Sequence, residues 1–571
     1  MRQIVTNFLL IIVSSTLFAQ TNFYVSQSGG NDLNDGLSPQ TAWATIQHAA
    51  NFAIPNSVVH IMEGIYHENV QVNVSGTAGN PIVFTNYQNG HVVIDGTGTP
   101  GTSLIRMTNK SWLHFENMEL RNLVRDNARG IMAETTPSGY ARNLSFKDIT
   151  IHTIRWTPDD GVIPGSGQDA RGFAVVGRGA GIEYISIVDC TIRDNVTGKS
   201  EALTFNGNVE DFLIEGCQVF NNTNIGICLA GNYGICANPS VDKTRNGIVR
   251  GNICYNNVSP LSSSAGIYVD GGENIVIERN NCFGNGTGIS VGCEQNGTTK
   301  YITVKNNLIH NNIGRGLAVG GHTLLSTGQV LFSTFRNNTL FQNNSELGYH
   351  SEIHLSKASN CVFEDNIIYS NDQNILLSVD NKLPQANNLF NYNCLYTPSG
   401  NPGDLNIYWH LQSFASLGQL QQALGQEVNS IFADPQLLSG SGSLSPQSVC
   451  LNAGNPALSL PAGELDFYGN PRLAGSAVDI GALEIPVALG LEEFMAEAKP
   501  FPNPVTDGVL HFNMDLDDAF FELFDLTGRK LWQSGHIRGR SLKLNTSARG
   551  ICFYRIVLDG KHRGAGKLVI R

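Results

Sequence analysis

The segment YITVKNNLIHNN, residues 301–312, contains the pattern that decides the fold. Ile302 and Val304 alternate with polar residues, Asn307 marks a polar turn, a second short apolar run follows, and an Asn pair closes the segment. Alternation with a period of two predicts a strand with one buried face. Asn tolerates the left-handed conformation that a sharp bend needs. The segment therefore predicts two short strands joined by a tight turn.

The same pattern recurs at a near-constant spacing. Its turn position is held by Cys190, Cys217, Asn252, Asn280, Asn307, Asn338 and Asn366, with steps of 27, 35, 28, 27, 31 and 28 residues. One repeat cannot bury its apolar face alone, but strands stacked at about 4.8 Å form a continuous core, and longer steps accommodate loops. The stacked Asn side chains are expected to form an amide ladder. The sequence thus predicts an all-β fold, a right-handed parallel β-helix.

Both ends of such a solenoid need covers, because an open end exposes unpaired backbone groups. Residues 39–53 (PQTAWATIQHAANFA) predict an N-terminal helical cap, with Ser38 as its N-cap. The stretch from Phe23 resembles the opening of many secreted β-helix proteins, including some pectate lyases. DPQLL, LNAGNPA and DIGALE, which begin at residues 434, 451 and 479, resemble their closing segment. We therefore assign residues 21–490 to the β-helix domain.

The N-terminus predicts export. Arg2 precedes the apolar run FLLIIVSSTLF at residues 8–18, which is too short to span a bilayer, so residues 1–20 are interpreted as a signal peptide. The formal net charge is −12, from 36 Lys and Arg against 48 Asp and Glu. This excess of negative charge argues against nucleic acid as a partner, because the phosphates of a nucleic acid bind to clusters of Lys and Arg.

The last part of the chain predicts a separate small β-sandwich, residues 496–571. It contains PNP at 502–504, DLTGR at 525–529 and a final KLVI at 567–570. These motifs resemble the C-terminal sorting domain of the type IX secretion system of Bacteroidetes. The resemblance implies contact with the secretion machinery, export through the outer membrane, and a secreted or cell-surface location. An ordinary carbohydrate-binding sandwich is the alternative.

The spacing of the eleven cysteines does not indicate a framework of disulfide bonds. Several occupy repeat positions that predict core, where a free thiol behaves as a small apolar group. Cys228 and Cys236 flank a loop and are the best disulfide candidate. A CxxC arrangement is absent from the sequence, which argues against a structural zinc site.

A ligand of a β-helix lies along one of its sheets, so outward side chains on neighbouring coils are the candidates. A second strand in each coil aligns on Leu203, Ile227, Ile267, Ile289 and Leu317, all predicted inward. The residues expected to position substrate beside this strand are Asn206, Asn208, Asn232, Arg245, Tyr268, Arg315 and His322.

Asp270 and Glu294 are the predicted catalytic residues. In register they lie one coil apart and two residues apart along the strand, which predicts a Cα separation of roughly 8 Å. Glycoside hydrolysis needs two carboxyl groups at such a range: one protonates the leaving oxygen, and the other acts as nucleophile or activates water. The placement resembles that in a family of β-helical β-xylosidases, with an Asp nucleophile and a Glu acid/base on adjacent coils. The resemblance implies Asp270 as nucleophile or base and Glu294 as general acid.

Two other functions stay open. The region 201–322 resembles a large group of secreted β-helix proteins that read GIYVDGG and then GIEVGCE, but Ser290 replaces a common Glu and Cys228 a common Asp. A polysaccharide lyase would use cations as base or clamp, with calcium held by carboxylates; the candidates are Lys199, Lys243, Arg245, Arg315, Asp194, Asp242 and Asp270. A non-catalytic surface glycan binder is the third hypothesis. The expected partner is a polysaccharide, and the protein is expected to be a monomer. No metal site and no required cofactor are expected, except calcium if the protein is a lyase.

Overall fold

The computed structural model describes residues 20–159, 161–261, 264–321, 328–380, 387–438, 442–485, 500–501, 503, 505, 508–512, 515–516, 518–525, 529–558 and 561–570. The chain divides into two compact units, Met1–Pro486 and Val487–Arg571. The predicted signal peptide lies, apart from its last residue, outside the described residues.

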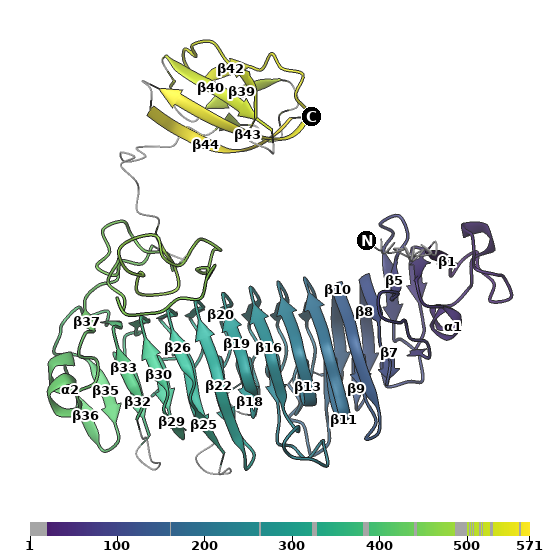
Figure 1. Cartoon of the computed structure of the whole chain (residues 1–571), viewed down its shortest axis with the longest axis horizontal. Helices are drawn as coiled ribbons and strands as arrows, with labels where there is room; N and C mark the ends of the chain where they lie inside the picture. Colours follow the sequence, from purple (N-terminus) through teal and green to yellow (C-terminus); the bar gives the residue numbers. More distant parts are fainter. Residues whose placement is uncertain are drawn as a thin grey trace, which may run out of the picture. The chain divides into compact units, whose positions relative to one another are not determined.

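The first unit is a stack of parallel strands, visible as successive arrows along the long axis in Figure 1. Each coil contributes a strand to each of three faces. The first face contains β1 (Thr21–Val25), β2 (Ser57–Ile61), β5 (Ile82–Asn86), the opening halves of β8 (Leu113–Val124) and β10 (Tyr140–Arg155), the closing halves of β11 (Ala170–Val188) and β13 (Leu203–Glu215), β16 (Thr244–Arg250), β19 (Glu273–Glu278), β22 (Thr298–Lys305), β25 (Gln329–Leu331), β26 (Thr334–Arg336), β29 (Ala358–Ser359), β30 (Val362–Glu364) and β33 (Leu389–Asn391).

The other two faces continue the same coils. The second face contains β3 (Gly64–Tyr66), β6 (Val92–Asp95), the closing halves of β8 and β10, β12 (Thr191–Arg193), β14 (Gln218–Phe220), β17 (Ile253–Tyr255), β20 (Asn281–Phe283), β23 (Leu308–His310), β27 (Thr339–Phe341), β31 (Ile367–Tyr369), β34 (Cys394–Tyr396) and β37 (Ile431–Phe432). The third face contains β4 (Val70–Val72), β7 (Ser103–Thr108), β9 (Ala128–Glu134), the opening halves of β11 and β13, β15 (Ile227–Ala230), β18 (Ala265–Asp270), β21 (Thr287–Cys293), β24 (Leu317–Gly321), β28 (Ile353–Leu355), β32 (Ile375–Val379) and β35 (Asn406–Trp409).

The core runs along the inside of the stack. The predicted inward positions are confirmed: Ile227 pairs in register with Ile267, Ile267 with Ile289 and Ile289 with Leu317, and all are buried. Aromatic side chains stack from coil to coil in the same way, as for Phe335 and Phe363, whose ring centroids lie 4.6 Å apart. The parallel β-helix predicted from the repeat is therefore the fold of this unit.

The predicted amide ladder is present and buried. Asn252 Nδ2 donates to Asn280 Oδ1 at 2.9 Å, and the same bond continues through Asn307, Asn338 and Asn366 to Asn393. Each Nδ2 also donates to a backbone carbonyl of the preceding coil. Every amide in the row donates to the next one, so the last amide, Asn393, needs a final hydrogen-bond acceptor. The Glu427 carboxylate supplies it, since Asn393 Nδ2 donates to this group at 2.9 Å.

A second ladder, which the sequence analysis did not identify, follows the second turn of each coil. It contains Asn195, Asn222, Asn257, Asn285, Asn312 and Asn343. This ladder also ends on a buried carboxylate, since Asn343 Nδ2 donates to Glu352 at 2.6 Å. The first row therefore fixes the turn between the first and second faces, and the second row fixes the turn that leads into the third face.

The N-terminal helix is shorter than predicted. α1 covers Ile46–Phe52 with Thr45 as its N-cap, whereas Ser38 caps a single 3₁₀ turn, η1 (Pro39–Thr41). The intervening Trp43 pairs through its backbone with β1: its N–H donates to Tyr24 O at 2.9 Å, and its carbonyl accepts from Ser26 N at 2.8 Å. This pairing holds the chain extended and delays the start of the α-helix from residue 39 to residue 46, about two turns.

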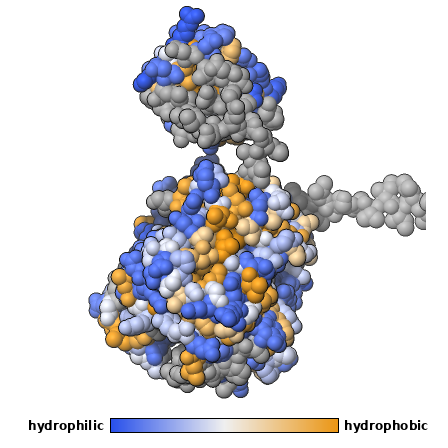
Figure 2. All heavy atoms as spheres, turned by 90° about the vertical axis from the view of Figure 1, so that its left-hand side faces the viewer, coloured by the Kyte–Doolittle hydropathy of each residue, from blue (hydrophilic) through white to orange (hydrophobic). Residues whose placement is uncertain are grey.

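At the other end, β36 (Gln412–Phe414) pairs antiparallel with β35 and leads into α2 (Leu417–Leu424). An antiparallel strand ends the parallel stack, which limits further pairing at this edge. Figure 2 views this end and shows hydrophilic and hydrophobic side chains intermixed on its surface.

The second unit contains two antiparallel sheets. One contains β38 (Pro500–Phe501), β39 (Val509–Phe512) and β42 (Ser541–Lys543), and the other β40 (Ala519–Phe524), β41 (Lys530–Gln533), β43 (Gly550–Leu558) and β44 (Lys561–Ile570). Leu510, Phe512 and Phe521 belong to one buried cluster that both sheets share. Parts of the PNP and DLTGR motifs lie outside the described residues.

All eleven cysteines are buried free thiols, so the Cys228–Cys236 disulfide candidate is wrong. Cys228 lies on β15, while the Cys236 thiol donates to the Gly177 carbonyl at 3.3 Å. Among the described residues, no helix has the length and apolar character required to cross a membrane.

Candidate functional site

Asp270 and Glu294 meet on the third face. Asp270 ends β18 and pairs in register with Gly292 of β21, so Glu294 follows two residues beyond that partner. The Glu294 backbone N–H donates to Asp270 Oδ1 at 2.7 Å. Register alone thus places two carboxyl groups of adjacent coils side by side.

Two tyrosines surround this pair, and one of them, Tyr233, was not predicted. Its hydroxyl donates to Asp270 Oδ2 and lies 3.5 Å from Glu294 Oε2. Tyr268, which was predicted to position substrate, donates to Glu294 Oε1 at 3.2 Å. Tyr233 belongs to the loop between β15 and β16, which lies outside the repeat, so the repeat did not predict its role. Its position just after β15, on the face of the carboxyl pair, was the one signal in the sequence.

The two carboxyl groups differ in environment. Asp270 is 2% exposed beneath Tyr233, whereas Glu294 is exposed. Burial, followed by the nearby charge of Glu294, raises the pKa of Asp270 to about 7. Two carboxyl groups with unequal solvation can take the two unequal roles of acid and nucleophile.

Small side chains flank the pair on the neighbouring strands. Asp270 lies between Ala230 and Gly292, and Tyr268 lies between Cys228 and Ser290. A Cβ on Gly292 would be 3.1 Å from the Tyr268 hydroxyl oxygen, so glycine leaves space for this ring to reach Glu294. The carboxyl pair and its tyrosines therefore rise above a floor of small residues.

Charged groups lie on the N-terminal side of this floor. Glu201 contributes to the raised pKa of Asp270, and it accepts a hydrogen bond from the Thr204 hydroxyl at 2.7 Å. Arg171 Nε lies 3.7 Å from Glu201 Oε2. Asn206 Oδ1, in register with Ala230, is buried without a hydrogen-bond partner among the described residues. Of the residues predicted to position substrate, Tyr268 contacts the pair, and Asn206 lies two strands from Asp270 on the same face.

Of the other predicted residues, Arg245 and Asn208 bond to each other, whereas the Asn232 side chain lies next to the pair and also donates to Cys293 Sγ at 3.7 Å. Arg245 donates to Asn208 Oδ1 at 2.9 Å and pairs with Glu210 at 2.7 Å. Asn232 has a left-handed backbone and donates to the Gly271 carbonyl at 3.4 Å, so it supports the loop that holds Tyr233. Arg315 precedes β24, two coils from β18, and its Nε is buried without a partner among the described residues. His322 lies outside the described residues.

The lyase candidates are not assembled around one point. Lys243 pairs with Glu273 at 3.0 Å, and Asp194 pairs with Arg193. Asp242 accepts the Gly234 backbone N–H at 2.6 Å and so orders the Tyr233 loop. Within the described ranges, no group of three or more His, Cys, Asp or Glu side chains could hold a metal ion.

The comparisons with known proteins agree with the fold. Residues 171–344 match the family described as "Right handed beta helix region". The uncharacterized protein YwoF of Bacillus subtilis (strain 168) is 31% identical over 428 residues, which cover 72% of this chain and 87% of YwoF.

Solved structures with a similar backbone are more distant. Pectate lyase Pel9A has 16% identity and a TM-score of 0.42, with 82% of this chain and 97% of that chain covered. The GH136 lacto-N-biosidase from Eubacterium ramulus has 14% identity and a TM-score of 0.42, with 66% and 64% covered.

Proposed function

The chain belongs to the family of YwoF from Bacillus subtilis, and from this premise and the geometry of its third face we propose that it is a carbohydrate-active enzyme that hydrolyses a glycosidic bond. The observation that supports hydrolysis is the pair Asp270 and Glu294, in contact across two coils and bridged by the Tyr233 hydroxyl. A rigid sheet holds both carboxyl groups, which such a reaction requires in fixed positions. The substrate is an extracellular polysaccharide or oligosaccharide.

The environments favour Asp270 as the general acid and Glu294 as the nucleophile, the reverse of the roles that the β-xylosidase resemblance implies. A carboxyl group with a pKa of about 7 retains a proton to give to the leaving oxygen at neutral pH. Glu294 is the exposed member, and the Tyr268 hydroxyl donates to it at 3.2 Å, as it would to a carboxylate. In this proposal, Glu294 attacks the anomeric carbon, Asp270 protonates the departing oxygen, and Tyr233 moves aside as the sugar enters.

The separation of the carboxyl groups predicts the stereochemical outcome. Asp270 and Glu294 both lie within hydrogen-bonding reach of the Tyr233 hydroxyl, so their nearest oxygens are closer than the roughly 6.5–9.5 Å of inverting enzymes. We expect the hydrolysis product to retain its anomeric configuration. Proton NMR spectra recorded in the first minutes of the reaction would show the retained anomer before mutarotation, and a first product of inverted configuration would contradict this expectation.

The pH profile tests the assignment of the acid. If Asp270 acts in its protonated form, kcat/KM should fall as pH rises through about 7, because the proton it must donate is lost. Tyr233→Phe removes a hydrogen bond that lowers the pKa of Asp270, so this descending limb should move to higher pH. A profile that rises through the same range would assign Asp270 to the role of base.

A product assay distinguishes hydrolysis from β-elimination. The purified protein would be incubated with plant and algal polysaccharides, with and without a calcium chelator, while reducing ends and the ultraviolet absorbance of unsaturated uronates are followed. Reducing ends without absorbance support the hydrolase. Absorbance that rises with the reducing ends would establish a lyase and overturn the proposal, and no product on any substrate would favour a non-catalytic glycan binder.

We also propose that the protein is exported, with residues 1–20 as a signal peptide and residues 496–571 as a sorting domain for the type IX machinery. The apolar run at 8–18 and the motifs at 502–504, 525–529 and 567–570 support this proposal. Deletion of residues 496–571 should then retain the protein in the periplasm of a host with this machinery. Continued appearance of the truncated protein in the medium would contradict the sorting assignment.

A further inference from the structure

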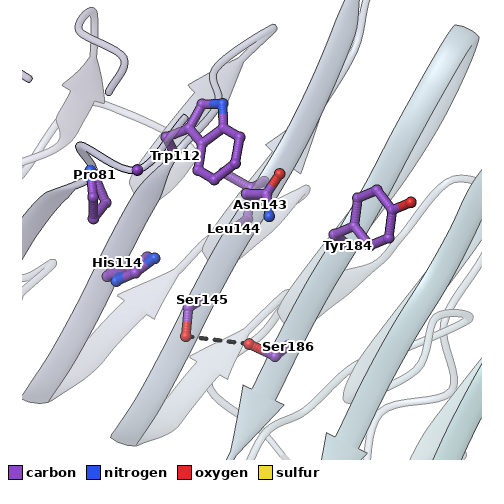
Figure 3. A pocket seen from close by; sticks show the side chains of 9 residues that line it. Pro81, Trp112, His114, Asn143, Leu144, Ser145, Tyr184 and Ser186 are labelled. Atoms are coloured by element: carbon purple, nitrogen blue, oxygen red, sulfur yellow. Dashed lines mark hydrogen bonds between the residues drawn. The ribbon is translucent and has the colours of Figure 1, made fainter. Parts of the chain in front are cut away.

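A hollow lies on the first face, several coils from the carboxyl pair. It has a volume of about 300 Å³ and is lined by Gly79, Pro81, Trp112, His114, Asn143, Leu144, Ser145, Tyr184 and Ser186. Figure 3 shows Trp112 and Tyr184 on either side of Asn143, with Ser145 and Ser186 on the strands below them. The Ser186 hydroxyl donates to Ser145 Oγ at 3.1 Å, so the floor is polar.

The two rings occupy a backbone position that disfavours them. Trp112, Asn143 and Tyr184 are successive residues of one row that precedes the first-face strands, in register across β8, β10 and β11. Each has a positive φ, of 58°, 52° and 55° respectively. The same row holds Asp211, Asn246 and Asn274 in later coils, also with positive φ.

Asn and Asp are the residues that tolerate this conformation best, apart from glycine, while a bulky aromatic residue there is a strained exception. The row therefore has a low-cost solution, which the chain uses at Asp211, Asn246 and Asn274 but not at its aromatic members Trp112, Tyr184, Tyr301 and Phe332. Of these four aromatic residues, Trp112 and Tyr184 line the hollow. Local strain of this kind is typical of binding sites, where a particular side chain is needed. Tyr184 is 47% exposed, so burial in the core does not account for its ring.

From the strained row and the hollow together, we propose that Trp112 and Tyr184 form an aromatic platform that binds the pyranose rings of a polysaccharide chain. The two residues are two strand steps apart, roughly 10 Å along the stack, so alternate sugars of an extended chain can lie on successive rings. Asn143, Ser145 and His114 offer hydrogen-bonding groups to the sugar hydroxyls. This inference goes beyond the proposed hydrolysis and does not depend on the Asp270–Glu294 pair.

The row itself supplies a matched test. Trp112→Asn and Tyr184→Asn introduce the residue that neighbouring coils use, so the fold should be retained with an unchanged or higher melting temperature. Tyr301→Asn is the control, because Tyr301 has a φ of 57° in the same row but does not line the hollow. Affinity gel electrophoresis of the full chain in xylan, β-glucan, arabinan or polygalacturonate would measure binding.

We expect the parent protein and Tyr301→Asn to be retarded by at least one of these polysaccharides, and the double variant Trp112→Asn/Tyr184→Asn to bind about tenfold or more weakly. Equal retardation of the parent and the double variant would overturn the proposal. Absence of retardation of the parent in all four polysaccharides would overturn it as well.

Discussion

Glu294→Gln is expected to lower kcat on the preferred glycan by at least about 10³-fold. The amide keeps the size of the side chain and can still accept a hydrogen bond from Tyr268, but it cannot attack an anomeric carbon. Because the contacts in the ground state change little, KM should change far less than kcat. Initial rates of reducing-end release over a range of substrate concentrations would separate the two constants.

Chemical rescue distinguishes a lost nucleophile from a damaged site. In Glu294→Ala, added azide can occupy the space of the missing carboxylate and attack the sugar in its place, which should restore cleavage and give a glycosyl azide. Glu273→Gln is the matched control. Glu273 is a carboxylate on the first face, where it pairs with Lys243 at 3.0 Å and Lys300 at 3.3 Å, and its replacement should leave kcat within about twofold. If Glu294→Gln retains parental activity, the carboxyl pair is not the catalytic centre.

The sequence allowed the scaffold to be predicted because its signals repeat. Asn280 and Asn307 recur with the coil, and stacking in register follows directly from that period. The second ladder was missed although its residues belong to the quoted Asn pairs. Period alone does not say which member of a pair enters a ladder, and in 301–312 the members that do so are Asn307 and Asn312.

The same logic applies to the candidate site. Asp270 and Glu294 lie on repeated strands, so their proximity could be predicted from register. Tyr233 lies in a loop that interrupts the repeat, and only its three-dimensional path brings its hydroxyl over Asp270. The burial of Asp270 depends on that loop, so the favoured assignment of acid and nucleophile could not be predicted from spacing.

The strongest effect on stability is expected from the amide ladder. Asn307→Ala removes the oxygen that accepts from Asn280 N at 2.9 Å and Asn280 Nδ2 at 3.0 Å, and the amide that donates to Ile277 O and Asn338 Oδ1. These groups are buried, so water does not replace the lost partners. We expect a loss of about 3–5 kcal/mol in the free energy of unfolding, measured by guanidinium titration with far-ultraviolet circular dichroism.

Two variants test whether this loss comes from the ladder. Asn281→Ala changes the residue that follows the ladder residue Asn280. Asn281 faces outward and accepts from His310 at 3.0 Å, so its replacement should cost less than about 1 kcal/mol. Asn307→Cys should fall between the two, because Cys217 holds the equivalent position two coils earlier than Asn280 and its thiol donates to Ile187 O at 3.5 Å. Equal stabilities for Asn307→Ala and Asn281→Ala would show that close packing, rather than the amide row, holds the coils in register. A graded loss from Asn to Cys to Ala would assign the stability to the donors and acceptors of the row.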